Sequence, residues 1–169
     1  FFVKNNDIEI GYIGIYGIFF LSIISYLTYF FIPHGQIFNT VIVISGFIYF
    51  YLNRNIIYIK KDLKYLLIIF FILILFILSA KNHDDFSYYH FSYIHLMTEF
   101  SNIIGLGNFN HGFRTPSSIF YFSSLFNLPY SNYFLLNISP VFFLGFSNLI
   151  FINKIKNYLC DMNNDLDMF

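Results

Sequence analysis

Two adjacent carboxylates carry the strongest chemical signal in this sequence of 169 residues. Asp84 and Asp85 follow a long apolar run that ends at Ala80. Neighbouring carboxylates repel one another, and such pairs are typical of sites that use a general base. Such a pair is also suited to Mg²⁺ or Mn²⁺ shared with a substrate phosphate, because these ions take oxygen ligands. The competing interpretation is that one Asp caps a helix N-terminus.

Three histidines lie close to the acidic pair in the sequence, at His83, His90 and His95. The spacing of five between the last two is poor for one ion, because side chains that share a helix face are three or four residues apart. This spacing argues against a dedicated zinc site and favours oxygen ligands. Glu99, further along, is expected to be a solvated residue on the polar face of the same helix.

A second polar group, the turn-like sequence NFNHGFR, contains His111 and Arg114. Thr115 and Pro116 follow it with the pattern of a helix start, Thr as N-cap and Pro as first helical residue. An arginine beside a helix N-terminus favours an anion site, because backbone N–H groups converge there. Lipid headgroups are the competing partner for this arginine.

The composition indicates a membrane protein. The chain is 57% hydrophobic and 11% charged, whereas soluble domains have about 25% charged residues. The net charge of zero argues against a nucleic-acid partner. Cys160 is the only cysteine, so an internal disulfide framework is excluded. Because the sequence does not begin with Met and its last residues resemble no terminus, we expect a fragment of a longer protein.

Four apolar runs predict an all-α fold with about four transmembrane helices. Each run is close to the roughly 20 residues that cross a hydrocarbon core. Asn39 and Ser45, inside the second run, are expected at a helix–helix interface. Pro140, inside the fourth, predicts a kink. The chain is thus predicted to be a single membrane domain, residues 1–169, with these spans: 11–32, 36–52, 65–80 and 131–152.

The basic residues predict which way the chain crosses the membrane. Seven Lys and Arg residues fall in three segments on one side, around residues 4, 54–64 and 154–156, against Lys81 and Arg114 on the other. The positive-inside rule makes the side with seven cytoplasmic. We therefore expect an integral protein of a bacterial inner membrane, with a cytoplasmic N-terminus and a periplasmic loop at 81–130.

Within this loop the spacing of apolar residues predicts two short helices. Apolar residues recur every three or four positions from Asp84 onward, opposite a polar stripe, which is typical of a helix lying in the membrane interface. Glycines at 105 and 107 are expected to end it. A second helix is expected over 117–127. The predicted apolar stripe consists of Phe86, Tyr89, Tyr93, Met97, Phe100 and Ile104.

The order of these features resembles the C-superfamily (GT-C fold) glycosyltransferases, polytopic enzymes that use polyprenyl-phosphate-linked sugars. The resemblance covers about fifty residues. Two apolar runs precede the one that leads into the loop, where that family has none. The matching positions, in order, are Asp84-Asp85 after a transmembrane helix, Tyr88/Tyr89 in an amphipathic helix, Gly105 to Gly107, and Arg114-Thr-Pro116.

The resemblance implies a role for each of the matching polar residues. Asp84 or Asp85 would be the base that activates an acceptor hydroxyl. His111 and Arg114 would hold the phosphate of a lipid-linked sugar, and Tyr88 would contact the same substrate. The partners implied are membrane lipid and the lipid-linked sugar.

Two other functions are compatible with the sequence. A polysaccharide transporter, flippase or polymerase would use the loop as a gate, although such proteins place ionisable residues within spans and the predicted spans contain no charge. A non-catalytic membrane assembly subunit would use Asp84 as a helix cap and the loop as a clamp on the lipid surface.

Overall fold

The computed structural model describes residues 9–53, 60–79, 84–131 and 133–166. The regular elements among them are helices, so the all-α prediction is confirmed. Short π- or 3₁₀-helical turns cover 86–90, 106–108, 111–113 and 133–135. The α-helices are α1 (Ile10–Tyr29), α2 (Gln36–Asn53), α3 (Lys60–Ser79), α4 (Phe91–Glu99), α5 (Ser118–Ser124) and α6 (Ser139–Leu166).

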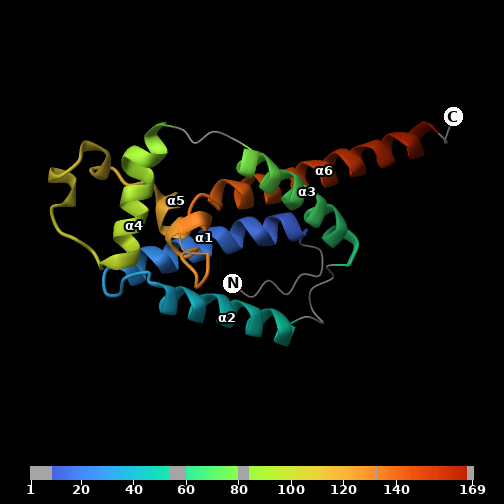
Figure 1. Ribbon diagram of the computed structural model, residues 1–169. Coiled ribbons are helices and arrows are strands. Elements are labelled where there is room, and N and C mark those ends of the chain that lie inside the picture. Colours follow the sequence, from blue (N-terminus) through green and yellow to red (C-terminus); the bar gives the residue numbers. More distant parts are fainter. Residues whose placement is uncertain (1–8, 54–59, 80–83, 132, 167–169) are drawn as a thin grey trace.

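The long helices α1, α2 and α6 extend away from α4, which stands across one end of them, and α3 slants across α6 (Figure 1). Glu9, just before α1, forms an ion pair of 3.9 Å with Lys154 of α6. The Lys156 ammonium lies 5.8 Å from the centre of the Tyr65 ring in α3. The starts of α1 and α3 therefore meet the later part of α6 at the end opposite α4. The positive-inside rule predicts that these segments lie on the same side of the membrane, the cytoplasmic side.

Small residues allow α6 to pack closely against α1 and α3. A Cβ atom on Gly14 of α1 would collide with the Phe146 ring, and one on Gly145 would lie 2.7 Å from the Phe70 ring. Phe70 in turn packs edge-on against Phe142 and Phe146 of α6, with ring centres 5.3 and 5.4 Å apart. Such aromatic pairs contribute about 0.5–1.5 kcal/mol each beyond the burial of area.

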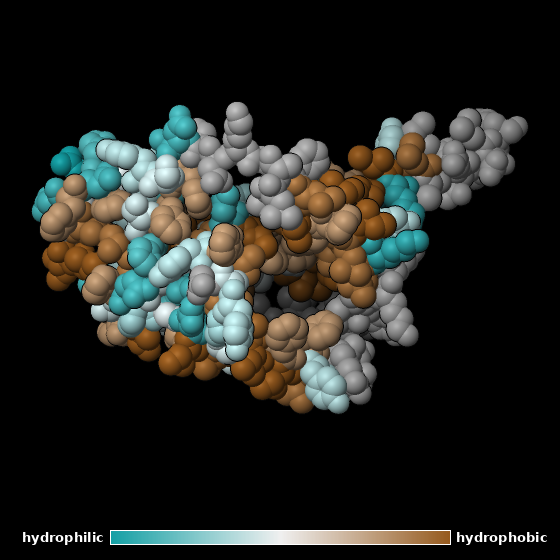
Figure 2. All heavy atoms as spheres, viewed as in Figure 1, coloured by the Kyte–Doolittle hydropathy of each residue, from teal (hydrophilic) through white to brown (hydrophobic). Residues whose placement is uncertain are grey.

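Helix α2 joins the rest of the protein near its first turns. Asn39 is completely buried, as its predicted interface position requires. Ser45 is exposed and donates to Val41 O of its own helix at 2.7 Å, so its predicted interface position is wrong. Every residue from 44 to 52 is exposed. Figure 2 shows hydrophobic side chains gathered on the side of the molecule where α2 lies.

One described helix, α1, is long and apolar enough to cross a membrane. Two further apolar helical stretches, Gln36–Leu52 and Leu63–Leu75, are shorter. The fourth predicted span, 131–152, is not one continuous helix, because α6 begins at Ser139. Pro140 is therefore the second residue of α6, where its missing N–H is not needed, and it starts the helix instead of kinking it.

The first helix of the predicted loop begins where expected but ends early. Residues 84–99 are helical, with a π-helical turn at 86–90. The chain leaves the helix after Glu99 because Asn102 N–H donates to Tyr29 O at 3.0 Å. Tyr93 and Met97 of the predicted stripe are buried, whereas Ile104, past the helix end, is 94% exposed.

The second helix of the loop is shorter than predicted and starts later. Helix α5 covers Ser118–Ser124 instead of 117–127, with Ser117 at the N-cap. Thr115 and Pro116 therefore precede the helix, contrary to the prediction. Helix α5 packs between α1 and α4 and holds Phe120 and Phe122 in the core, and its C-cap residue Leu125 is buried as well. Residues 84–131, called the end layer below, thus lie across the α4 end of the long helices.

Candidate functional site

The acidic pair lies at the start of the helical stretch of the end layer. Asp84 is exposed and Asp85 is half-buried. The Asp85 side chain makes no capping hydrogen bond. The Asp84 carbonyl accepts a hydrogen bond from Ser87 Oγ at 3.1 Å. The π-helical turn that follows the pair is a rare local structure that often occurs at functional sites.

A close contact joins this turn to the predicted phosphate-binding turn. A Cβ atom on Gly112 would lie 2.6 Å from the Tyr89 ring, so the 3₁₀ turn His111–Phe113 packs directly on the π-helical segment. Asn110 Oδ1 accepts from Gly112 N–H at 2.9 Å and fixes that turn. The structure therefore brings the segment after the acidic pair and the turn that carries His111 side by side.

Arg114 occupies a different setting from the one predicted. Its Nε–H donates to Gly107 O at 3.2 Å, so the side chain folds back over the preceding turn. Helix α5 begins only at Ser118 and has seven residues, so the predicted arginine directly beside a helix N-terminus is wrong. Arg114 and His111 are both exposed, as a ligand contact requires.

Tyr88 is 65% exposed and lies edge-on to Tyr89, with ring centres 6.3 Å apart. Its side chain is open to solvent beside the acidic pair. Glu99 is exposed, as expected, and it also accepts a hydrogen bond from Tyr133 OH at 3.2 Å.

The histidines of the predicted loop do not converge. His83 lies outside the described residues. The His90 ring lies 5.0 Å from the Phe120 ring centre, and the His95 ring lies 4.7 Å from that of Tyr133. Across the described ranges, no three His, Cys, Asp or Glu side chains group as metal ligands. Asp84 and Asp85 are adjacent helical residues, whose side chains do not face each other. One of the two carboxylates still fits Mg²⁺, which commonly completes its shell with water and substrate phosphate.

A buried polar cluster, not predicted from the sequence, lies where the end layer meets α1 and α2. His34, in the turn between these helices, has no exposed surface. Its Nδ1 lies 2.7 Å from Ser124 Oγ and 3.3 Å from Ser25 Oγ. Its Nε2 lies 3.1 Å from Thr28 Oγ1. A neutral ring satisfies both sides, because it donates at one nitrogen and accepts at the other.

Asn39 completes this cluster. Its Nδ2 donates to the carbonyls of His34, Ser124 and Asn127, at 2.7, 2.8 and 3.0 Å. The His34 N–H donates to Met97 O at 2.9 Å and so satisfies a carbonyl near the end of α4. One turn and one amide therefore tie α1, α2, α4 and α5 together.

Burial lowers the pKa of His34 from 6.5 to about 4, because the charged ring would lose its hydration. The short distance from His34 to Ser124 suits a base and a nucleophile, but both side chains are completely buried. The His34–Ser124 pair therefore has a structural role, which is to connect the turn between α1 and α2 to α5. The sequence signal for it was a Pro-His-Gly turn between two apolar runs, which holds the one histidine outside the 83–111 segment.

Comparison with known proteins places the chain in one family. The model of a family described as a domain of unknown function (DUF8201) matches residues 1–169, and the chain belongs to that family. No curated protein and no solved structure matches it.

Proposed function

We propose that this member of the DUF8201 family is a multi-pass protein of a bacterial inner membrane, with α1, α2, α3 and α6 as spans. The exposed apolar run at 44–52 in α2 supports this proposal. A large apolar side chain left in water forgoes about 1.5–3 kcal/mol of burial, and lipid removes that cost for the whole run. The short apolar stretch of α3 fits because Lys64, near its start, can extend toward the interface.

The proposed sidedness is tested by cysteine labelling. We introduce His111→Cys in a Cys160→Ser background of the full-length protein, in which any cysteine outside residues 1–169 is also replaced by Ser. Intact cells are then treated with a membrane-impermeant maleimide. We expect the cysteine at position 111 to react. In the parent protein, Cys160 should react only after the cells are permeabilised. Labelling of Cys160 from outside would reverse the proposed orientation.

For the activity, we propose transfer of a sugar from a polyprenyl phosphate donor to an acceptor at the exterior face. The observation that carries this is the contact between Gly112 and Tyr89. It holds the His111 turn against the helical turn that follows Asp84 and Asp85. An acidic pair and exposed phosphate-binding candidates then share one end of the end layer, next to the proposed membrane surface.

In the proposed reaction, Asp84 or Asp85 takes the proton of the acceptor hydroxyl as its oxygen bonds to the anomeric carbon. The bond from that carbon to the phosphate oxygen breaks, and polyprenyl phosphate leaves with the electron pair. Arg114 and His111 bind the phosphate, and Tyr88 contacts the sugar. Mg²⁺ or Mn²⁺, held by the carboxylate of the pair that does not act as the base, would supply positive charge to the phosphate.

The activity is tested with Asp84→Asn, Asp85→Asn and the double variant in the full-length protein. General-base catalysis contributes about 10²–10⁴-fold, so we expect losses of that size in one single variant and in the double. Glu99→Gln is the control, because it removes another exposed carboxylate of the same helix. Unchanged transfer in the double variant would rule out the base assignment.

A non-catalytic assembly subunit is the second candidate. The observation that favours it is the buried cluster at His34, which makes the end layer a rigid platform fixed to α1 and α2. Retained sugar transfer in cells that carry the double Asp variant, with loss of transfer on deletion of the whole protein, would favour this function.

A further inference from the structure

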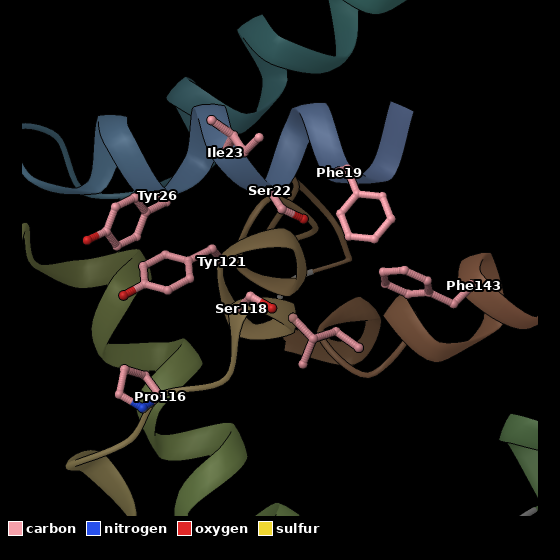
Figure 3. Close-up of a pocket in the computed structure, with 9 residues that line it drawn as sticks. Phe19, Ser22, Ile23, Tyr26, Pro116, Ser118, Tyr121 and Phe143 are labelled. Carbon is pink, nitrogen blue, oxygen red and sulfur yellow. The ribbon is translucent and has the colours of Figure 1, made fainter. Parts of the chain in front are cut away.

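A groove of about 840 Å³ lies between α1, α5 with the preceding Pro116, and α6. Phe19 and Phe143 lie at one end of it, and Tyr26 and Tyr121 lie at the other (Figure 3). It is an open trough, because Phe19, Ile23 and Tyr26 are 56%, 59% and 45% exposed. The lining residues are Phe19, Ser22, Ile23, Tyr26, Pro116, Ser118, Ile119, Tyr121 and Phe143.

The groove has an apolar end and a polar end. Phe19 and Phe143 pack edge-on, with ring centres 6.2 Å apart. Tyr26 and Tyr121 pack edge-on at 5.1 Å, and their hydroxyl groups lie toward the same side in Figure 3. Ser22 adds little polarity, because its hydroxyl donates to Ile18 O within α1 at 2.8 Å. This gradient fits an amphiphile.

The position of the groove along α1 determines how deep in the bilayer a bound molecule would lie. From Phe19 to Tyr26 the helix rises roughly 10 Å, about a third of a hydrocarbon core. The polar end lies toward the C-terminus of α1 and the end layer. In the proposed topology this stretch is the outer half of the bilayer, so the groove opens sideways to the chains of outer-leaflet lipids.

We propose that this groove binds one acyl chain of a glycerophospholipid, with the headgroup beside Tyr26 and Tyr121. The inference rests on the membrane placement in the proposed function and not on the proposed chemistry. Occupancy follows the ratio of ligand concentration to dissociation constant. An open groove facing the bilayer meets bulk phospholipid at a far higher concentration than any carrier lipid. The bound chain would cover the exposed surfaces of Phe19 and Ile23.

Residues 1–169 contain no Trp, so a single introduced Trp reports on the groove once any Trp outside this range is replaced by Phe. We place Phe143→Trp in the groove and Leu144→Trp beside it, where the side chain is 53% exposed and does not line the groove. Phosphatidylglycerol with brominated acyl chains is added to the full-length protein in detergent. We expect saturable quenching of the Phe143→Trp variant, with an apparent dissociation constant about tenfold lower than for Leu144→Trp.

A blocking variant tests occupancy directly. Ser22→Phe fills the groove, and in the Phe143→Trp background it should raise the dissociation constant about tenfold or more. Ser45→Phe is the matched control, because its hydroxyl makes the same bond to a carbonyl four residues earlier, on the exposed α2. The control should bind like the parent protein.

Three results would overturn the inference while membrane placement stands. They are equal quenching at both Trp positions, no effect of Ser22→Phe, and displacement of the brominated lipid by polyprenyl phosphate at concentrations where phosphatidylglycerol fails to displace it. The last would assign the groove to a carrier lipid. Recovery of the protein in the soluble fraction would instead refute the proposed membrane placement itself.

Discussion

The Nδ1 atom of His34 lies 2.7 Å from Oγ of Ser124, a residue 90 positions later in the chain. This contact joins the turn between α1 and α2 to α5, and both side chains are completely buried. The orientation of the end layer on the long helices therefore depends on a few polar contacts as well as on apolar packing.

Asn39→Leu should destabilise the protein more than His34→Leu. Without the Asn39 amide, the buried carbonyls of His34 and Asn127 lose this hydrogen-bond donor. Each unsatisfied carbonyl costs about 1–3 kcal/mol of stability. Without the His34 ring, Ser124 and Thr28 still donate to backbone carbonyls. We expect a loss near 3 kcal/mol for Asn39→Leu in thermal unfolding in detergent. Asn102→Leu, at an exposed position, is the control and should change little.

The stability of the protein should fall with acid because of His34. Its pKa is about 4 in the folded chain and 6.5 in the unfolded one, since burial disfavours the charged ring. The unfolded chain therefore binds a proton between these values that the folded chain does not. The stabilisation is complete above pH 6.5, and about 3 kcal/mol of it is lost as the pH falls to about 4.

The measurement compares the free energy of unfolding of the parent protein with that of His34→Gln over this pH range. Carboxylates titrate in both proteins, so the difference isolates the histidine. We expect a shallower dependence on pH for His34→Gln. Equal slopes between pH 4.5 and 6.5 would show that His34 does not titrate as its burial requires.

Local patterns were enough to predict the helices, and tertiary contacts account for the misses. Apolar runs located α1, α2 and α3, because their composition is uniform over many residues. The early end of α4 depends on the bond from Asn102 to Tyr29 O, between segments far apart in the sequence. Pro140 was placed inside a span because the apolar run continues on both sides of it, although the helix starts there.

The sequence predicted which residues form the candidate site, but it predicted only part of their arrangement in space. The His111 turn can approach the helix closely because Gly112 faces Tyr89. This contact joins two separate segments and cannot be predicted from the spacing of residues along the sequence. The buried cluster was missed because Ser25, His34 and Ser124 come from three separate segments. Each of them alone resembles an ordinary polar residue within or beside an apolar stretch.

Gly14→Ala should weaken the packing of α1 on α6. The added Cβ would collide with the Phe146 ring, and such overpacking costs about 1–3 kcal/mol. Gly17→Ala is the matched control in the same helix, because nothing lies within 4 Å of its Cβ position. Replacing a helical glycine by alanine there should stabilise by roughly 0.5–1 kcal/mol. Melting temperatures that move in the same direction for both variants would contradict this packing.

Gly112→Ala should lower the proposed transfer activity without loss of the folded protein. The added Cβ would meet the Tyr89 ring at 2.6 Å and push the His111 turn away from the helix that follows the acidic pair. We expect a higher KM for the lipid-linked donor and a melting temperature close to that of the parent. Gly46→Ala, with open space around its Cβ position, is the control. A KM for Gly112→Ala equal to that of the parent would show that the His111 turn is not part of the donor site.

Ile44→Lys should impair membrane insertion of α2. Position 44 begins the exposed apolar run of that helix, and a lysine near the centre of a span costs about 2.5–3.5 kcal/mol on insertion scales. Ile104→Lys is the control, because Ile104 is 94% exposed in the end layer, outside the proposed spans. An engineered glycosylation or protease site after α2 reports the inserted fraction. We expect a clear decrease for Ile44→Lys and none for Ile104→Lys. Equal insertion of both would mean that lipid does not surround α2 and that a protein surface covers it instead.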